Sequence, residues 1–375
     1  MQKMPKTLVE KLNERLENEN LRQLPINHQL IDFSSNDYLG LAKNEDLFEE
    51  VHNFLIQNHY NHNGSSGSRL ISGNHPLYEK LESFLSDFHQ VEEAIVFSSG
   101  FAANIGFFSS VPQKKDLVLF DEYCHASIRE GLLLSSAKSY KFKHNDLADL
   151  ERLLKNNQNS ENIYVVTESV FSMDGDSPDF HQIINLKKTY PFYLIVDEAH
   201  AVGVFGAHGE GLLQSLGYHE DVFARIITFS KAIGCHGGAI LVDKTLKQYL
   251  INFARSFIYS TALTPHTLAT ILLAYEKMAK DSSLLKQLHH NITYFGEELK
   301  KTNANLSNNL SAIQTVSYFD AIKTKKKSLL LSKNGFHAMP ILSPTVPRGK
   351  ERIRLCLHNF NTEHDIFHLI KLLNT

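Results

Sequence analysis

The sequence predicts an α/β fold whose centre is a mostly parallel β-sheet covered by helices. Between residues 94 and 243, short apolar runs rich in β-branched and aromatic residues alternate with stretches long enough for helices. These runs are almost continuously apolar, as expected of strands that are buried on both faces. Several of them end in polar residues, where sheets of this kind form their ligand sites.

The first residues predict an amphipathic helix that forms an N-terminal arm. Leu8, Leu12 and Leu16 recur every fourth residue and are separated by charged residues. We expect this apolar stripe to pack on a larger body.

The strands of the predicted sheet follow further along the chain. They occupy residues 94–99, 117–121, 164–170, 193–199, 226–230 and 238–243. The polar residues at their ends are Ser99, Asp121, Asp197 and Ser230. Because the carboxyl ends of parallel strands meet at one edge of a sheet, we expect these side chains to line one crevice.

The last third of the chain predicts a smaller α+β domain. The pattern is mainly helical from about residue 260 to near 305, and strand-like pieces follow at 337–344 and 352–358 before a last helix. The polar stretch 303–309 is the best candidate for a flexible loop. The expected division is an arm over 1–35, a large domain over 36–260 and a C-terminal domain over 261–375.

Composition argues against several classes of protein. The net charge of -3 and the pI near 6.7 give no basic excess for nucleic acid. The cysteines Cys124, Cys235 and Cys356 lie far apart without a CxxC pair, so we expect neither disulfides nor a zinc knuckle. This pattern is typical of a protein in a reducing compartment, and we expect the cytoplasm. We also expect no metal, no secretion signal and no membrane span.

The strongest candidates for chemistry are an acid and an amine at the ends of two strands. Asp197 lies in VDEAH (196–200) and Lys231 in TFSKA (228–232). A pyridoxal cofactor needs a lysine for its Schiff base and a carboxylate against its pyridine nitrogen. A lysine after a strand is more often a surface residue, so it is the pair that points to this cofactor.

Two further segments could serve the same site. The run SSGFAANIG (98–106) follows a strand and opens a helix, so the amides of Ser99, Gly100 and Phe101 could hold a phosphate, although the run could also be only a capped turn. His125 could stack on a flat ring, although a lone histidine is more often structural. Its neighbour Cys124 does not make a Cys/His nucleophile, because adjacent residues rarely face each other.

Other enzyme classes lack their motifs in this chain. DEAH also occurs in helicase-type nucleotidases, but there is no GxxxxGK[ST] loop for the phosphates. GxGxxG and GxSxG are also missing, which argues against a dinucleotide dehydrogenase and an α/β-hydrolase. A binding protein that kept the fold without the chemistry would not need Asp197 and Lys231.

Along nearly its whole length the chain resembles the α-oxoamine synthases, which are fold-type I enzymes dependent on pyridoxal 5'-phosphate (PLP). The resemblance is carried by IDFSSNDYLGL (31–41), GSSGSRLISGNHPLYEKLE (64–82), DEYCHASIREG (121–131), TESVFSMDGD (167–176), VDEAHAVGVFG (196–206), TFSKAIGCHGGA (228–239) and PTVPRGKERIRL (344–355). It implies a seven-stranded sheet and a homodimer with the active site at the interface.

The resemblance implies a role for each matching residue around the cofactor. Lys231 would form the Schiff base, Asp197 would pair with the pyridinium nitrogen and His125 would stack on the ring. His200 and Ser172 would contact the 3'-oxygen. The phosphate would be held by Ser99, Gly100, Phe101 and Thr228, with Ser260 or Thr261 from a second subunit. The catalytic set is Lys231, His125, Asp197 and His200.

The resemblance also implies a reaction, the joining of an amino acid to an acyl thioester with loss of carbon dioxide. Arg354 would bind the amino-acid carboxylate, while Arg22, Asn36 and Thr345, together with His125, would lie near the substrates. The similarity is greatest to the biotin-pathway members, which use L-alanine and a pimeloyl group on coenzyme A or acyl carrier protein. Ser230 departs from their usual glycine, so siblings that use glycine with acetyl or serine with palmitoyl groups stay open.

Overall fold

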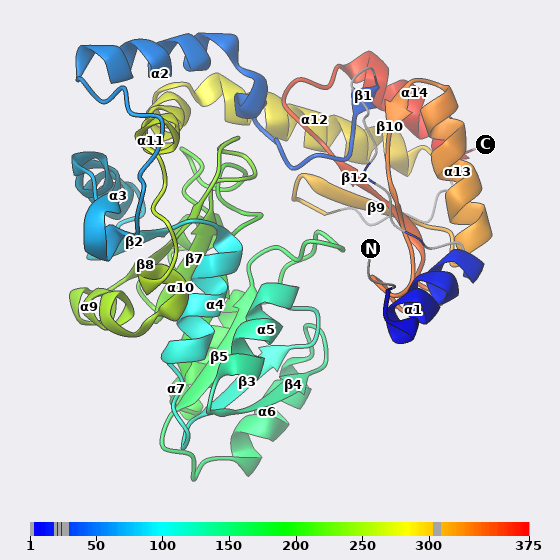
Figure 1. The fold of residues 1–375 in the computed structure, drawn as a ribbon. Helices are drawn as coiled ribbons and strands as arrows, with labels where there is room; N and C mark the ends of the chain where they lie inside the picture. Colours follow the sequence, from blue (N-terminus) through cyan, green and yellow to red (C-terminus); the bar gives the residue numbers. More distant parts are fainter. Residues whose placement is uncertain (1–3, 19–20, 22–23, 25–29, 303–308, 375) are drawn as a thin grey trace.

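The computed structural model describes residues 4–18, 21, 24, 30–302 and 309–374. It contains a larger part built on a seven-stranded sheet and a smaller part built on a three-stranded sheet (Figure 1). Arg22 and residues 303–308 of the predicted flexible loop lie outside the described residues.

The central sheet confirms the predicted α/β fold. Its strand order is β2-β8-β7-β6-β5-β3-β4, and β8 alone among them runs antiparallel to its neighbours. The strands are β2 (Glu93–Phe97), β3 (Leu117–Asp121), β4 (Lys138–Phe142), β5 (Ile163–Glu168), β6 (Tyr193–Asp197), β7 (Ala224–Thr228) and β8 (Gly238–Val242). Each predicted strand is present. Strand β4 was not predicted, because this edge strand is largely polar and exposed.

Helices cover both faces of the sheet, which explains the continuous apolar runs. In β8, Ile240 and Val242 face one layer, whereas Ala239 and Leu241 face the other. The first layer is α4 (Gly100–Ser110), α5 (Ala126–Leu134), α9 (Lys244–Phe253) and α10 (Arg255–Ile258). The second is α3 (Pro76–Phe88), α11 (Pro265–Lys280), α6 (Leu147–Asn156), α7 (Phe180–Thr189) and α8 (Leu212–Ser215).

The smaller part combines a strand near the beginning of the chain with the strands and helices of the C-terminal third. Strands β9 (Ile313–Ser317), β11 (Pro340–Ile341) and β12 (Arg352–Cys356) form an antiparallel sheet, with α13 (Ala321–Lys333) and α14 (Glu363–Asn374) beside it (Figure 1). Strand β1 (Ile31–Asp32) pairs in parallel with β10 (Phe336–His337). This pairing brings the segment after β1, which carries Asn36, toward the C-terminal strands. Helices α2 (Glu45–Gln57) and α12 (Ser282–Lys300) complete the layer around α11.

The N-terminal helix is present, but its apolar stripe is not covered as expected. Helix α1 spans Lys6–Glu17 and contains no buried residue. Leu8, Leu12 and Leu16 are 46%, 50% and 62% exposed. The described part of one chain therefore offers this stripe no partner, and a partner would have to come from elsewhere.

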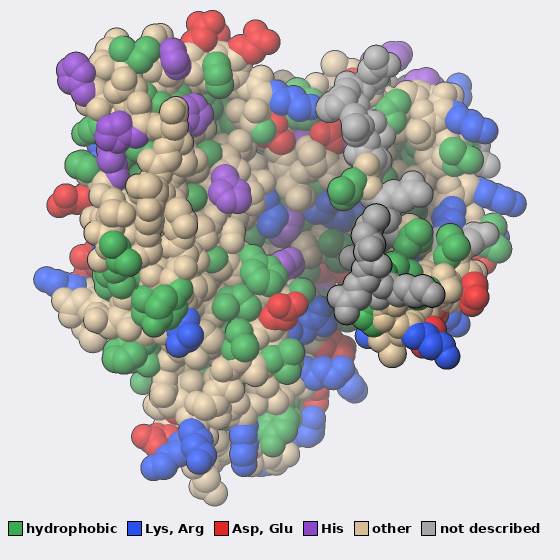
Figure 2. Space-filling model, in the orientation of Figure 1, with side chains coloured by type: hydrophobic (Ala, Val, Ile, Leu, Met, Phe, Trp, Pro, Cys, Tyr) green, Lys and Arg blue, Asp and Glu red, His purple; other side chains and the backbone are tan. Residues whose placement is uncertain are grey.

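The surface has no single dominant charge on the face shown in Figure 2, where acidic and basic side chains are interspersed over both parts. No described helix combines the length and apolar character needed to cross a membrane. Within the described ranges, no group of three or more His, Cys, Asp or Glu side chains is placed to hold a metal ion.

Candidate active site

A cavity of about 250 Å³ lies where several strands of the central sheet end. Its wall combines the ends of β5, β6 and β7 with the segment after β3 and the first turn of α4. Among its lining residues are Ser99, Gly100, Phe101, Asn104, His125, Ser127, Glu168, Asp197, His200, Thr228, Ser230 and Lys231. Ser99, Asp197 and Ser230, which were predicted from separate strand ends, therefore meet in one place. The expectation for Asp121 is wrong, because its carboxylate accepts the main-chain N–H groups of Tyr123 and Asn145 and contacts His144 outside this wall.

Asp197 is held rigidly at the end of β6. One carboxylate oxygen accepts a hydrogen bond from the Asn104 side chain at 2.9 Å, and the other accepts the main-chain N–H of Ala199 at 2.9 Å. Asn104 also donates to Ser127, and its own oxygen is buried without a hydrogen-bond partner. The carboxylate is thus fixed in direction, with an unsatisfied polar atom beside it.

Lys231 follows β7 and presents its amine to the same cavity. No hydrogen bond joins this amine to another described residue. Burial lowers the pKa of Lys231, and the positive charge of Arg354 adds to this, whereas the acidic groups of Asp197 and Glu168 oppose it. A desolvated amine with a lowered pKa is the form that reacts as a nucleophile or a base.

His125 is the N-cap of α5, and its ring lies in the cavity wall. Its Nδ1 and the hydroxyl of Ser127 are 2.7 Å apart, and its main-chain N–H donates to Glu168 at 2.6 Å. Burial lowers the pKa of His125, and this effect is opposed by Asp197. The ring therefore favours the neutral form, as a stacking partner for another flat ring requires.

Glu168 is a buried acid at the end of β5. Burial and the neighbouring Asp197 raise the pKa of its carboxyl well above the usual range. The cavity consequently holds one acid that favours its neutral form close to the rigid carboxylate of Asp197.

His200 connects the cavity to the smaller part of the molecule. Its Nδ1 lies 2.7 Å from the hydroxyl of Tyr38, which also donates to Asn36 at 3.2 Å. Burial holds the pKa of His200 well below its usual value, and Lys231 lowers it further. The phenol carries a single hydrogen, so the tautomer of His200 depends on whether that hydrogen is donated to Nδ1 or to Asn36.

Arg354 reaches the same network from β12. Its Nη2 donates to Asn36 at 2.9 Å and its Nε donates to the carbonyl oxygen of Ser172 at 2.6 Å. A third bond, at 3.0 Å, goes from Nη1 to the sulfur of Cys356. A guanidinium carries five N–H donors, so donors remain for an anionic ligand after these contacts.

The turn before α4 supports both readings that the sequence left open. Ser99 caps the helix by accepting the N–H of Ala102 at 3.0 Å. Gly100 lies so close to Thr228 that a Cβ at this position would be 3.1 Å from the threonine hydroxyl. A capped turn of this kind still points its first free amides outward, where they can hold a phosphate.

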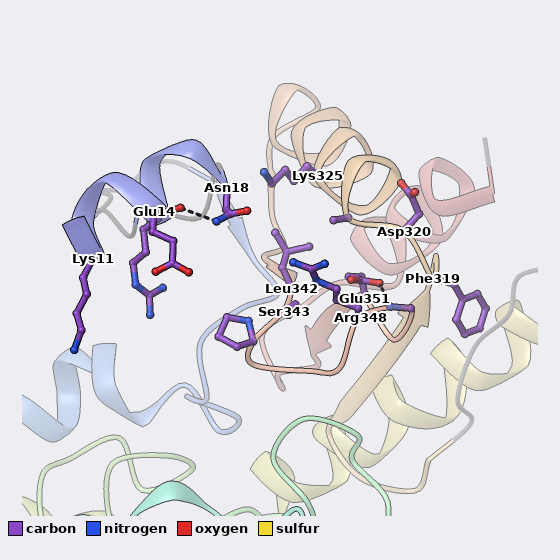
Figure 3. A pocket seen from close by; sticks show the side chains of 14 residues that line it. Lys11, Glu14, Asn18, Phe319, Asp320, Lys325, Leu342, Ser343, Arg348 and Glu351 are labelled. Atoms are coloured by element: carbon purple, nitrogen blue, oxygen red, sulfur yellow. Dashed lines mark hydrogen bonds between the residues drawn. The ribbon is translucent and has the colours of Figure 1, made fainter. Parts of the chain in front are cut away.

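Several predicted residues do not line this cavity in the described chain. Asn36, Ser172 and Arg354 belong to the network that leads to His200, whereas Asp121, Ser260, Thr261 and Thr345 are not part of the wall or of that network. Thr261 is exposed and forms an isolated β-bridge with Ser68. Thr345 is exposed in the loop before β12. That loop borders a second, larger hollow of about 760 Å³, where α1 faces the loop across the side chains of Lys11, Glu14, Phe319, Asp320, Arg348 and Glu351 (Figure 3). The larger hollow does not contain the acid and amine pair.

A model of the family described as aminotransferase class I and II matches residues 28–371. The chain belongs to the aminotransferase class I and II family.

The chain is also similar to individual members of this family. The 8-amino-7-oxononanoate synthase of Emericella nidulans is 37% identical over 92% of this chain and 89% of the relative. A solved 8-amino-7-oxononanoate synthase of Francisella tularensis has a TM-score of 0.78 at 30% identity, covering 92% of this chain and 97% of that one. These similarities confirm the resemblance to the α-oxoamine synthases.

A further solved structure shares the fold of this aminotransferase-family chain. Serine palmitoyltransferase from S. paucimobilis, with a bound PLP-myriocin aldimine, has a TM-score of 0.90 at 24% identity and covers 98% of this chain and 96% of that one. The seven-stranded sheet and its covering helices are therefore those of an enzyme fold that holds PLP in another protein.

Sequence reasoning missed several residues of the site. Glu168 ends the observed strand β5, whereas the predicted strand ran on to residue 170, so a strand end placed two residues earlier would have singled it out. Asn104 and Tyr38 had no comparable signal, because an asparagine within a helix and a tyrosine in a loop reach the site only through tertiary packing.

A substitution at Gly238 tests whether the turn that begins α4 contributes to cofactor binding. A Cβ at Gly238 would lie 2.7 Å from the amide nitrogen of Gly100. We therefore expect Gly238→Ala to displace that amide, to cost about 1–3 kcal/mol of unfolding free energy, and to weaken PLP binding about tenfold. Thermal unfolding and PLP titration measure both effects. Gly64→Ala is the control, since nothing lies within 4 Å there, and an unchanged PLP affinity in Gly238→Ala would contradict the prediction.

Proposed function

We propose that this protein is a PLP-dependent acyltransferase that condenses L-alanine with a pimeloyl thioester. The reaction joins the α-carbon of alanine to the thioester carbonyl carbon, and releases the carrier thiol and carbon dioxide. Its product is 8-amino-7-oxononanoate, a precursor of biotin. The observation that carries the proposal is the meeting of the Lys231 amine and the Asp197 carboxylate in one cavity, in a chain whose relatives bear this enzyme's name.

The residues around the cavity fit PLP. Lys231 provides an amine without a hydrogen-bonding partner among the described residues, and Asp197 provides a rigid carboxylate for a protonated pyridine nitrogen. A Cβ at Gly100 would lie 3.1 Å from the Thr228 hydroxyl, so glycine keeps a side chain from crowding the first amides of α4, which would hold the phosphate. When bound, PLP supplies an electron sink that stabilises negative charge on the α-carbon of the amino acid.

Each residue has a task that follows from its surroundings. Lys231 would hold the cofactor covalently, and its amine, when free, would take the α-proton of alanine, for which its lowered pKa suits it. His125 would stack on the cofactor ring. His200 and Ser172 would hold the 3'-oxygen, and Ser99, Gly100, Phe101 and Thr228 would hold the phosphate.

The alanine carboxylate binds Arg354, which is fixed by Asn36 and Ser172 and retains free donors. Asn36, which accepts from Arg354, and Thr345, which is exposed in the loop before β12, would meet the acyl substrate in this proposal. In this proposal the thioester enters between the large domain, 36–260, and the C-terminal domain, 261–375, while 1–35 forms an arm. Coenzyme A and acyl carrier protein are both candidate carriers of the acyl group.

The working form that we propose is a homodimer in the cytoplasm, with the active site at the interface and Thr261 of a second copy completing the phosphate site. Large apolar side chains that are exposed in one chain give such a copy a surface to cover, and they include Leu70, Ile71, Leu133, Leu134 and Tyr259. The free cysteines Cys124, Cys235 and Cys356 agree with a reducing compartment.

The test is substrate-dependent release of the carrier thiol. The purified protein with PLP is mixed with pimeloyl-CoA and with L-alanine, glycine or L-serine in turn. We expect thiol release and carbon dioxide with L-alanine, and at most about a tenth of that rate with the other two, since one missing methyl or one added hydroxyl changes selectivity by roughly 10- to 200-fold.

The outcomes of this experiment are distinct. Turnover only with glycine or L-serine would move the enzyme to a sibling α-oxoamine synthase, for which Ser230 before the lysine would be the first residue to examine. Turnover with none of the three amino acids, on either acyl carrier, in a protein that binds PLP, would contradict the proposed reaction. Replacing pimeloyl-CoA with pimeloyl-loaded acyl carrier protein then decides between the two carriers.

A further inference from the structure

A histidine outside the cavity lies between two carboxylates that belong to different segments. The Nδ1 of His144 is 3.0 Å from Asp121 at the end of β3, and its Nε2 is 2.9 Å from Asp176. A neutral imidazole can donate from only one nitrogen, so the two contacts together require the charged ring. The side chain of Asn145 supports the same arrangement by donating to Asp176 at 2.8 Å.

The ring of His144 is also packed between aromatic side chains. Tyr123 stacks on it with 4.3 Å between ring centroids, and Phe171 meets it edge-on at 4.5 Å. Tyr123 belongs to the short segment between β3 and His125, and Phe171 begins the turn that contains Asp176. One histidine thus holds both segments at once.

The turn over 171–176 is one of the contacts between the central sheet and the C-terminal strands. Its main-chain carbonyls accept hydrogen bonds from Arg354 at Ser172 and from Ser311 at Gly175, at 2.6 and 2.8 Å. The side chain of Asp174 pairs with Arg352. The turn is tightly fitted, since a Cβ at Gly175, whose φ is +74°, would lie 2.3 Å from the carbonyl oxygen of Ile313.

We propose that His144 is a positioning residue, which clamps the 171–176 turn to the end of β3 and so fixes where Arg354 and His125 face the substrate. The inference rests on the proposed function, because it takes the roles of Arg354 and His125 from there. His144 itself does not line the cavity and touches no reacting atom. Its effect is transmitted through Ser172 on one side and through Tyr123 on the other.

The charge of His144 persists over the working range of pH. Burial favours the neutral ring, but hydrogen bonds to Asp121 and Asp176 prevail and raise the pKa of His144 to about 10 from its ordinary 6.5. The phenol of Tyr123 and the carboxylate of Glu122, which accepts the main-chain N–H of His144, are the other titratable groups that face it. The charged ring is therefore lost only as the pH rises through about 10. While the two carboxylates are ionised, its contribution to the stability of the fold is largest below about pH 6.5 and falls as the pH rises toward 10.

The experiment compares His144→Gln with the wild-type holoenzyme in steady-state kinetics. We expect the KM for L-alanine to rise about tenfold, with kcat reduced less than about threefold, because the carboxylate-binding arginine is displaced while the cofactor chemistry is kept. A role in folding alone would not single out the KM for one substrate. The control is His290→Gln, since His290 also pairs with a carboxylate, Glu363 at 2.8 Å, but both are about half exposed.

A second variant, Asp176→Asn, tests the same inference if His144→Gln does not fold. Asp176→Asn leaves the contact between His144 and Asp121 and removes one charged partner, so it should raise the KM for L-alanine less and lower the pKa of His144, which a proton NMR titration measures. An active wild-type enzyme whose variants keep the wild-type KM overturns this inference alone. A wild-type protein that releases no thiol with alanine overturns the proposed function and the inference with it.

Discussion

Lys231→Ala is expected to abolish condensation, with a loss of about 10³-fold or more in turnover. General-base catalysis by itself contributes about 10²–10⁴-fold, and the variant also loses the covalent anchor of the cofactor. The described chain places no other amine in the cavity wall that could take its place. The measurement is the visible absorbance of the protein with PLP, followed by thiol release with L-alanine and pimeloyl-CoA.

The control for Lys231→Ala is Lys280→Ala, which removes a lysine whose side chain is 76% exposed and paired with Glu276. This control should keep both the absorbance band and turnover. The thermal midpoint of each variant without cofactor tests folding. A Lys231→Ala protein that keeps the protein-bound band and turns over at the wild-type rate would remove the central residue of the proposed mechanism.

The fold was predictable from sequence because buried parallel strands have an unusual composition. Strands such as 193–197 and 238–242 are buried over most or all of their length, so most of their positions are apolar and they stand out from the helices between them. The antiparallel direction of β8 was not predicted, because a strand buried on both faces has the same composition in either direction. Strand β4 was not predicted because it lies at an exposed edge of the sheet, where a strand needs few apolar residues.

The core of the site was predictable because it lies at strand ends. Asp197 and Lys231 could be paired from their positions alone, and the cavity contains both. Tyr38, Asn104 and His144 could not be found in this way, since each acts across contacts more than 20 residues apart in sequence. Such contacts depend on how helix α4 and the loops that carry Tyr38 and His144 pack against the sheet. A local sequence pattern does not show this packing.

The second large effect is expected at Asp197. Asp197→Asn keeps the size of the side chain but removes the negative charge that stabilises a protonated pyridine nitrogen. Removing one preorganised electrostatic partner costs about 10²–10³-fold in kcat, and we expect a loss near the upper end of that range. Lys231 is untouched, so PLP should still bind and give its absorbance band. A band without turnover therefore distinguishes this variant from Lys231→Ala.

The substitution is one that the protein can fold around. Both oxygens of Asp197 accept hydrogen bonds, so an asparagine there would turn one acceptor into a donor facing Asn104. The oxygen of Asn104 is free of partners, and a flip of its amide would present that oxygen to the new donor.

Asp116→Asn is a matched control for Asp197→Asn. Asp116 is also buried and also accepts one main-chain N–H and one asparagine amide, from Gln113 at 2.7 Å and Asn162 at 2.8 Å, but it does not line the cavity. If both variants fold and only Asp197→Asn loses turnover, the loss comes from the charge at the cofactor site. Equal losses in the two variants would instead trace the effect to a buried carboxylate that merely supports the fold, and Asp197 would have no special part in the reaction.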